Sequence, residues 1–157
     1  MVKGQTILLI HGAGSVGNEW RNFQKSFETL GNKVVVPTLR LHKVGNAVSS
    51  DLGQVSIVDY VNDMEEIIKK LDQEPIIIGY SMGGLIGLIL CSRGFGKLGI
   101  FITPAAPSGI NAITLSVLRV FIKNVFRWKF WRKPVPPNFP SAYYGVLHDL
   151  SKEKAKE

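Results

Sequence analysis

Short runs of apolar residues, separated by polar or glycine-rich stretches, fill the first two thirds of the chain. Four such runs occupy residues 6–10, 33–36, 75–78 and 99–102, and Ile, Leu and Val dominate them. Unbroken apolar runs of this length are typical of parallel strands that are covered on both faces. The pattern therefore predicts four strands, the second of which is ended by Pro37.

Between these runs, apolar residues recur at helical spacing. A first helix is expected from about Ser15 to just before Gly31, and a third across residues 84–91. The second helix begins at the capping box Ser56-Ile57-Val58-Asp59. The expected buried faces consist of Trp20, Phe23, Phe27 and Leu30 in the first helix, and of Ile57, Tyr60, Val61, Met64, Ile67, Ile68 and Leu71 in the second.

Strands and helices therefore alternate along the chain, and residues 39–55 are expected to form a loop. Connections between parallel strands are almost always right-handed, which distributes the helices over the two faces of the sheet. The predicted fold class is α/β, with a parallel sheet flanked by helices on both faces.

The motif Gly79-Tyr80-Ser81-Met82-Gly83 lies directly between the third predicted strand and the third predicted helix. Its pattern, G-x-S-x-G, arises by chance in about one chain of this size in twenty, so the context must decide. A strand, a sharp turn and a helix are the context that a nucleophile elbow needs. We expect Gly79 and Gly83 to be required because side chains there would collide with the strand or the helix.

Composition narrows the class of protein. The 157 residues are 45% apolar and 20% charged, which indicates one globular domain and not a disordered chain. The single cysteine, Cys91, lies in an apolar helical run and is expected to act as a small buried hydrophobe. The first residues lack the layout of a signal peptide, so a cytoplasmic protein is expected. The longest apolar stretch, residues 76–91, is too short and too rich in glycine to span a membrane.

The net charge of +7 is placed unevenly. Residues 1–92 carry 8 basic and 9 acidic side chains, whereas residues 93–157 carry 11 basic and 3 acidic ones. Basic faces can bind nucleic acid or anionic membranes. Here the excess also reflects a lack of acidic residues, because neither Asp nor Glu occurs between Pro75 and His148. We therefore expect no nucleic-acid partner.

With these elements in place, the chain resembles the N-terminal part of a cap-bearing member of the α/β-hydrolase superfamily. The resemblance rests on His11-Gly12 after the first strand, on the elbow at residues 79–83, and on a fourth strand that runs into Thr103-Pro104-Ala105-Ala106-Pro107. It implies that Ser81 attacks an acyl carbon and that the backbone amides of Met82 and Ala13 stabilise the oxyanion. It also implies that His11 is a structural residue beside the oxyanion loop.

Physical chemistry supports this site independently. Met82 opens a helix, so its N–H has no intrahelical partner and favours negative charge. Gly12 and Gly14 would let the loop backbone approach the same point closely. The alternative interpretation is a phosphate-binding glycine loop, but residues 11–18 complete neither G-x-G-x-x-G nor a P-loop. We expect no cofactor and no metal.

The acid and the histidine of a catalytic triad are missing. The family order is Ser, acid, His, yet the only acidic residues after Ser81 are Asp149, Glu153 and Glu157, and no histidine follows them. His148 is expected to be a surface helical residue and His42 an exposed loop residue. The sequence therefore predicts a chain that stops before the triad acid and base, either as a fragment or as a natural short form.

Residues 1–112 are expected to form the hydrolase core and residues 113–157 the start of a helical cap. In the stretch 115–131, Arg119, Lys123 and Arg127 share one stripe, while apolar and aromatic residues cover a broad arc. Such a helix could be a lid over an active site or could lie on an anionic membrane surface. The lid interpretation accounts for the same pattern and is preferred.

Two classes of function remain at this stage. The first is a serine hydrolase that acts on a small apolar ester or related acyl substrate. The second is a catalytically inactive fragment, or a binding module whose basic amphipathic cap contacts a membrane surface or a partner. In either case the fourth strand is expected at an open edge of the sheet, where it would favour self-association.

Overall fold

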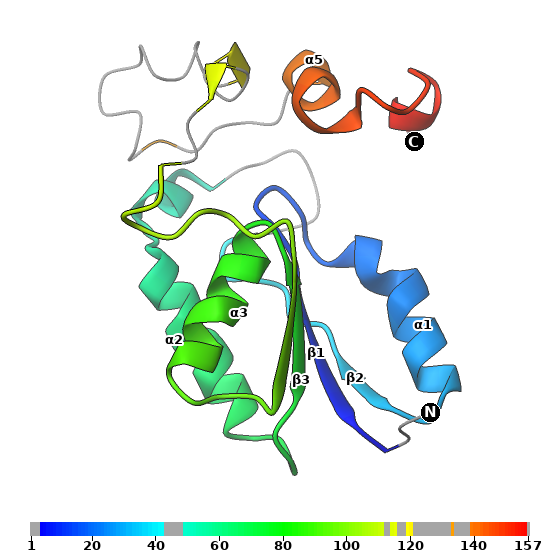
Figure 1. The fold of residues 1–157 in the computed structure, drawn as a ribbon, viewed down its shortest axis with the longest axis vertical. Coiled ribbons are helices and arrows are strands. Elements are labelled where there is room, and N and C mark those ends of the chain that lie inside the picture. Colours follow the sequence, from blue (N-terminus) through cyan, green and yellow to red (C-terminus); the bar gives the residue numbers. More distant parts are fainter. Residues whose placement is uncertain are drawn as a thin grey trace.

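The computed structural model describes residues 4–42, 49–111 and 139–156, together with residues 114, 115, 119, 120 and 133. Four parallel strands form one sheet, in the order β2-β1-β3-β4 (Figure 1). Their bounds are β1 Thr6–Ile10, β2 Lys33–Val35, β3 Ile76–Tyr80 and β4 Leu98–Ile102. The four predicted strands and their parallel arrangement are confirmed.

The centre of the sheet is formed by β1 and β3, which pair with Leu8 opposite Ile77 and Ile10 opposite Gly79. Every residue of β1 is buried. A strand covered on both faces can be apolar throughout, which explains why β1 shows no alternation of apolar and polar residues.

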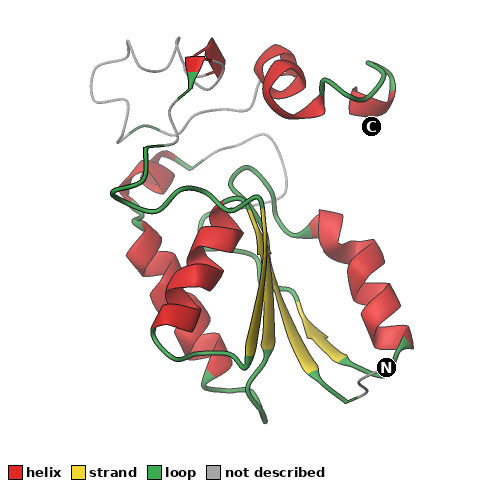
Figure 2. Cartoon of the chain, viewed as in Figure 1, coloured by secondary structure: helices red, strands yellow, loops and turns green. Residues whose placement is uncertain are grey.

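Helices cover both faces of the sheet, as predicted (Figure 2). The helix α1, Arg21–Thr29, lies on one face, and α2, Ile57–Ile68, and α3, Met82–Ser92, lie on the other. The first helix begins later than expected, because residues 15–17 form a turn in which the Gly17 N–H donates to the Ser15 hydroxyl. A 3₁₀ helix at Asn18–Trp20 then leads into α1.

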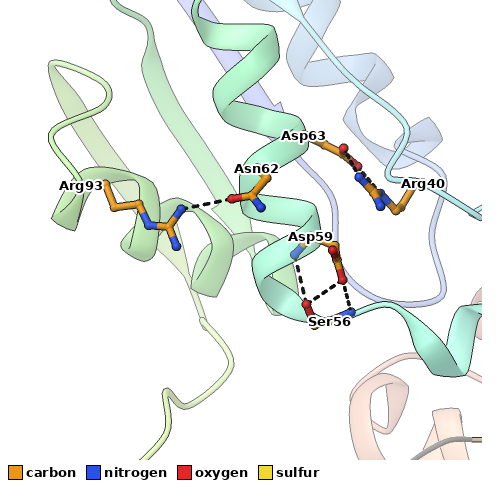
Figure 3. Close-up of polar contacts among 6 residues, drawn as sticks. All are labelled: Arg40, Ser56, Asp59, Asn62, Asp63 and Arg93. Carbon is orange, nitrogen blue, oxygen red and sulfur yellow. Dashed lines mark hydrogen bonds and ion pairs between the residues drawn. The ribbon is translucent and has the colours of Figure 1, made fainter.

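The predicted capping box of α2 is present (Figure 3). The Asp59 N–H donates to the Ser56 hydroxyl at 3.2 Å, and the Ser56 N–H donates to the Asp59 carboxylate at 2.8 Å. Two ion pairs also fasten this helix. Arg40, in the segment after β2, binds Asp63 on α2. Arg93, directly after α3, binds Glu65 on α2 at 2.6 Å. These contacts fix α2 against α3 and against the segment after β2.

The main core lies between the sheet and the pair α2 and α3. Its fully buried side chains include Leu8 and Ile77 from the sheet, Val61 and Met64 from α2, and Ile86 and Leu90 from α3. Leu39 also belongs to this core, although residues 39–55 were expected to be loop only. That segment further contains a 3₁₀ helix, Ser50–Gln54, which the composition of the stretch did not indicate.

The face predicted for the first helix is only partly buried, and here the prediction was wrong. Trp20 is buried and Phe27 packs against the same cluster, but Phe23 and Leu30 are 52% and 38% exposed. The four residues fall on two neighbouring stripes of the helix. Within the described residues α1 is the only helix on its face of the sheet, so it can bury only the stripe that points straight at the strands.

Strand β4 forms an edge of the sheet within the described part of the chain. Phe101 faces α3, where its ring meets Gly87. On the opposite face Leu98, Ile100 and Ile102 are 53%, 45% and 42% exposed. The reason is that the cluster beneath α1 includes residues of β1, β2 and β3 but none of β4. An apolar edge strand without charged residues is the arrangement that invites pairing with another chain.

The C-terminal segment lies at the end of the molecule where the strands finish (Figure 1). It consists of α5, Phe139–Ala142, a π-helical turn at Tyr143–Leu147 and a 3₁₀ turn at Lys154–Lys156. The Arg119 guanidinium stacks on the Tyr144 ring at 4.6 Å. Most of the predicted cap helix at 115–131 lies outside the described residues, and the boundary at residue 112 stays a prediction. Among described helices, none is long and apolar enough to cross a membrane.

Candidate active site

Ser81 occupies a strained turn between β3 and α3. Its backbone has φ 51° and ψ −121°, a region that side-chain-bearing residues rarely adopt. The hydroxyl makes no capping hydrogen bond to the helix that follows. Strain of this kind persists only where the surrounding structure enforces it, and it gathers at functional sites.

Three backbone hydrogen bonds enforce the conformation of Ser81. Its N–H donates to the Ile102 carbonyl at 3.1 Å, and its carbonyl accepts the N–H of Ala105 at 2.9 Å and of Leu85 at 3.1 Å. The end of β4 and the turn after it therefore hold the elbow from one side, while α3 holds it from the other. Thr103, between these two partners, also has a positive φ of 40°.

The two outer glycines of the elbow are required for steric reasons. A Cβ atom at Gly79 would lie 2.3 Å from the Gly83 carbonyl oxygen, and a Cβ atom at Gly83 would lie 2.2 Å from the Ile10 carbonyl oxygen. Both obstacles are backbone atoms, which cannot rotate away. The close packing that the sequence predicted is thus present, and it sets the first turn of α3 directly on the end of β1.

The loop after β1 lies against the elbow. A Cβ atom at Gly12 would lie 3.2 Å from the Ser81 Cβ atom and 2.7 Å from the Tyr80 ring, so a side chain there would displace the elbow. Gly14 differs from the prediction, because nothing lies within 4 Å of its Cβ position. Its φ of 80° shows that this glycine serves the turn and not a close approach.

Two backbone amides are candidates for binding an anion beside Ser81. Met82 is the first residue of α3, and the first hydrogen bond of the helix is donated by Leu85. The Met82 N–H therefore has no acceptor within the helix. Ala13 is exposed and directly follows Gly12, which contacts the elbow. Both amides therefore belong to the segments that meet at the serine.

His11 is buried and uses both ring nitrogens. The Leu39 N–H donates to Nε2 at 3.0 Å, so Nδ1 carries the proton and donates to the Gly12 carbonyl at 2.8 Å. Burial lowers the pKa of this imidazole below its ordinary value, and the hydrogen bond to Gly12 opposes the shift only in part. His11 is thus a neutral link between the loop after β1 and the segment after β2.

The structure corrects the prediction for His42. Its ring is partly buried and meets the rings of His11 and Tyr60 at centroid distances of 5.3 and 5.7 Å. Its Nδ1 lies 3.0 Å from the Arg40 carbonyl oxygen. The residue was expected to be exposed because it lies in a polar loop, but aromatic packing draws the start of that loop inward.

The stability of the protein should depend on pH through His11. Its pKa is lowered in the folded state, so the unfolded chain binds the proton more readily below pH 6.5. The stabilising contribution of the neutral His11 is therefore fully present above pH 6.5. As the pH falls below 6.5, the free energy of unfolding decreases by at most about 1.4 kcal/mol per pH unit because of this group. Urea unfolding at pH 7.5, 6.5 and 5.5 measures this loss.

His11→Gln should flatten the dependence over that range. Equal slopes for the unsubstituted protein and His11→Gln would contradict this role.

His148 lies at the surface. Its side chain is 60% exposed, and Nε2 is 3.6 Å from the carboxylate of Asp149, which is itself 94% exposed. This pair follows the π-helical turn of the C-terminal segment. Within the described residues, no group of three His, Cys, Asp or Glu side chains is placed to hold a metal ion.

One polar cluster beside the elbow was not found from the sequence. The Tyr80 hydroxyl donates to Glu19 Oε1 at 2.5 Å, and the Ser15 hydroxyl donates to the same oxygen. Burial acts to raise the pKa of Glu19, but these two hydroxyl groups outweigh it and hold the pKa below the ordinary value. The four-residue spacing of Ser15 and Glu19 was the only signal, and it is common in any helical stretch.

A family model described as Alpha/beta hydrolase family matches residues 7–154. The chain belongs to this family. It is 29% identical over 145 residues to an AB hydrolase superfamily protein of Gibberella zeae, and the match covers 91% of this chain and 43% of that protein. The chain therefore spans less than half the length of this relative.

Solved structures share the fold of this α/β-hydrolase chain. An extracellular α/β-hydrolase from a Paenibacillus species superposes with a TM-score of 0.74 at 19% identity, over 97% of this chain and 63% of that one. A polyneuridine aldehyde esterase gives 0.64 at 15% identity, over 98% and 66% of the two chains. A thioesterase domain from the curacin biosynthetic pathway gives 0.59 at 21% identity, over 97% and 57%.

Proposed function

We propose that Ser81 is the nucleophile of a serine hydrolase that cleaves an ester or a related acyl compound. The observation that carries this proposal is the strained Ser81, held by three backbone hydrogen bonds with Gly12 packed against its Cβ atom. A serine held in this way, between a strand and a helix, presents its hydroxyl to a substrate at the end of the sheet.

In the proposed reaction the Ser81 hydroxyl attacks the acyl carbon and a histidine accepts its proton. The carbonyl oxygen becomes an oxyanion, which the N–H groups of Met82 and Ala13 stabilise. The alcohol then leaves with the proton that the histidine held, and water releases the acyl group from Ser81 by the same steps. The proposal assigns the acid and the histidine to no residue of this chain.

Proteins of similar structure support an ester or a related acyl compound as the class of substrate, but they do not identify the substrate itself. The esterase and the thioesterase domain share this fold, and both names refer to acyl chemistry. The apolar residues of the stretch 115–131 suit a small apolar acyl group, although this stretch lies mostly outside the described residues. The alternative function, a binding module without catalysis, depends on the same residues 115–131. No contact among the described residues favours that alternative.

Covalent labelling tests the proposal. A fluorophosphonate probe should modify the complete hydrolase domain at Ser81, and Ser81→Ala should abolish the labelling. Ser92→Ala is the matched control, since Ser92 lies at the exposed end of the same helix with its hydroxyl on the Ile89 carbonyl. Labelling that survives Ser81→Ala would refute the assignment.

A further inference from the structure

A single carboxylate joins the loop after β1 to the elbow. Glu19 Oε1 accepts the Tyr80 hydroxyl at 2.5 Å and also the Ser15 hydroxyl. The Ser15 oxygen in turn accepts the Gly17 N–H at 3.1 Å. Glu19 thus connects Ser15, and through it Gly17, with Tyr80, the residue directly before Ser81.

Tyr80 is itself fixed firmly enough to serve as an anchor. Its backbone ends β3, its ring meets the Trp20 ring at 5.6 Å, and Gly12 packs on it so closely that a Cβ atom would lie 2.7 Å from the ring. The hydroxyl that reaches Glu19 therefore projects from a ring that is packed against both Trp20 and Gly12. A hydrogen bond to this hydroxyl therefore holds the loop after β1 in a fixed position relative to the elbow.

The loop needs such a bond because two glycines make it pliable. Gly14 and Gly17 have φ of 80° and 89°, so the turn between them uses conformations that glycine also samples freely when unfolded. Without side-chain contacts, ordering this turn would be opposed by its backbone entropy. Hydrogen bonds to a charged carboxylate are among the stronger ones available to offset that cost.

We propose that Glu19, acting through Tyr80 and Ser15, is a positioning residue that fixes the Ala13 amide relative to Ser81. This inference rests on the proposed function of Ser81 and deepens it. The carbonyl of Gly12 and the N–H of Ala13 belong to one trans peptide, so they point in opposite directions. His11 holds the carbonyl on one side, and the Glu19 cluster holds the chain beyond Ala13 on the other.

The role predicts a specific pattern among three variants. Glu19→Ala removes the acceptor for both hydroxyls and should free the loop. Tyr80→Phe removes only the hydroxyl that ties the loop to the elbow, and should act in the same direction. Glu19→Gln keeps an oxygen that accepts two hydrogen bonds but loses their charge, so it should retain most of the order of the unsubstituted protein.

The first experiment measures the loop in the 157-residue chain without any reaction. In ¹⁵N relaxation, the order parameters of the Ala13 to Gly17 amides should fall from about 0.85 to below about 0.6 in Glu19→Ala. Glu19→Gln should retain the higher value. Glu28→Ala is the control, because it breaks an exposed side-chain hydrogen bond to Gln24 on α1, away from the elbow. Unchanged order parameters in Glu19→Ala would overturn the proposal.

The second experiment measures ester hydrolysis by the complete domain. A displaced oxyanion donor weakens the transition state more than the bound substrate, so Glu19→Ala should lower kcat by about 10- to 100-fold with little change in KM. An alkyl boronic acid, which mimics the tetrahedral state, should lose affinity in parallel. A change in melting temperature with kcat intact would show a merely structural role and overturn the proposal.

The two experiments separate failure of this inference from failure of the proposed function. If the unsubstituted domain neither hydrolyses esters nor reacts with a fluorophosphonate, the assignment of Ser81 fails, and with it the effect on kcat. The order parameters then still decide whether Glu19 holds the loop.

Discussion

Gly83→Ala is expected to lower the free energy of unfolding by about 3 kcal/mol or more, enough to remove a large part of the stability of a domain of this size. The new methyl group would lie 2.2 Å from the Ile10 carbonyl oxygen and 2.5 Å from that of His11. These oxygens belong to the last residue of β1 and to the residue after it, so relief requires α3 to move away from β1. That movement would also separate Met82 from the loop that carries Ala13.

Gly87→Ala is the matched control for this effect. The substitution lies in the same helix and gains the same helix propensity of about 1 kcal/mol. Its methyl group would meet the Phe101 ring at 2.7 Å, and a ring on an edge strand can turn aside where a carbonyl cannot. Urea unfolding should therefore show a far smaller loss for Gly87→Ala. Equal stability of the two variants would contradict the packing of α3 on β1.

The second large effect concerns catalysis by this chain alone. The 157-residue chain should hydrolyse a short p-nitrophenyl ester about 10⁴-fold or more below the rate of a hydrolase with a working triad, because we assign none of its histidines as the base. The chain has three histidines. His11 uses both nitrogens in backbone hydrogen bonds, His42 packs between His11 and Tyr60, and His148 is exposed beside Asp149.

Some activity should remain, because an oxyanion hole and binding alone give about 10³- to 10⁴-fold acceleration over water. Steady-state rates of the chain, of Ser81→Ala and of His148→Ala measure it. Ser81→Ala and His148→Ala should both leave the residual rate nearly unchanged, because that rate does not depend on a working triad. A rate typical of an enzyme that disappears in His148→Ala would identify His148 as the base and contradict this account.

The elements that carry the fold could be predicted because each has a local cause. The apolar run of β1 is long enough for a doubly covered strand, and the Ser56 and Asp59 capping box marks the start of α2 without tertiary information. The elbow at residues 79–83 was found in the same way, since its glycines and the elements on both sides are consecutive in sequence. Their steric necessity is now visible in the backbone contacts of Gly79 and Gly83.

Several features that escaped prediction depend on distant parts of the chain. Phe23 and Leu30 have helical spacing, yet their exposure follows from the absence of a second helix beside α1 in the described structure. His42 lies in a polar loop, and only the fold brings it between His11 and Tyr60. The bond between Glu19 and Tyr80 spans 61 positions and requires β3 to lie next to β1, which spacing along the chain does not reveal.

The central claim, that Ser81 forms a covalent bond to the acyl group, is tested most directly by trapping the acyl-enzyme. The complete domain is mixed with p-nitrophenyl acetate, the reaction is quenched with acid in the first turnovers, and the digested protein is analysed by mass spectrometry. The account predicts a burst of p-nitrophenol and an acetyl group on the peptide that contains Ser81. Hydrolysis that proceeds with an unmodified Ser81, or with the acetyl group on another residue, would contradict it.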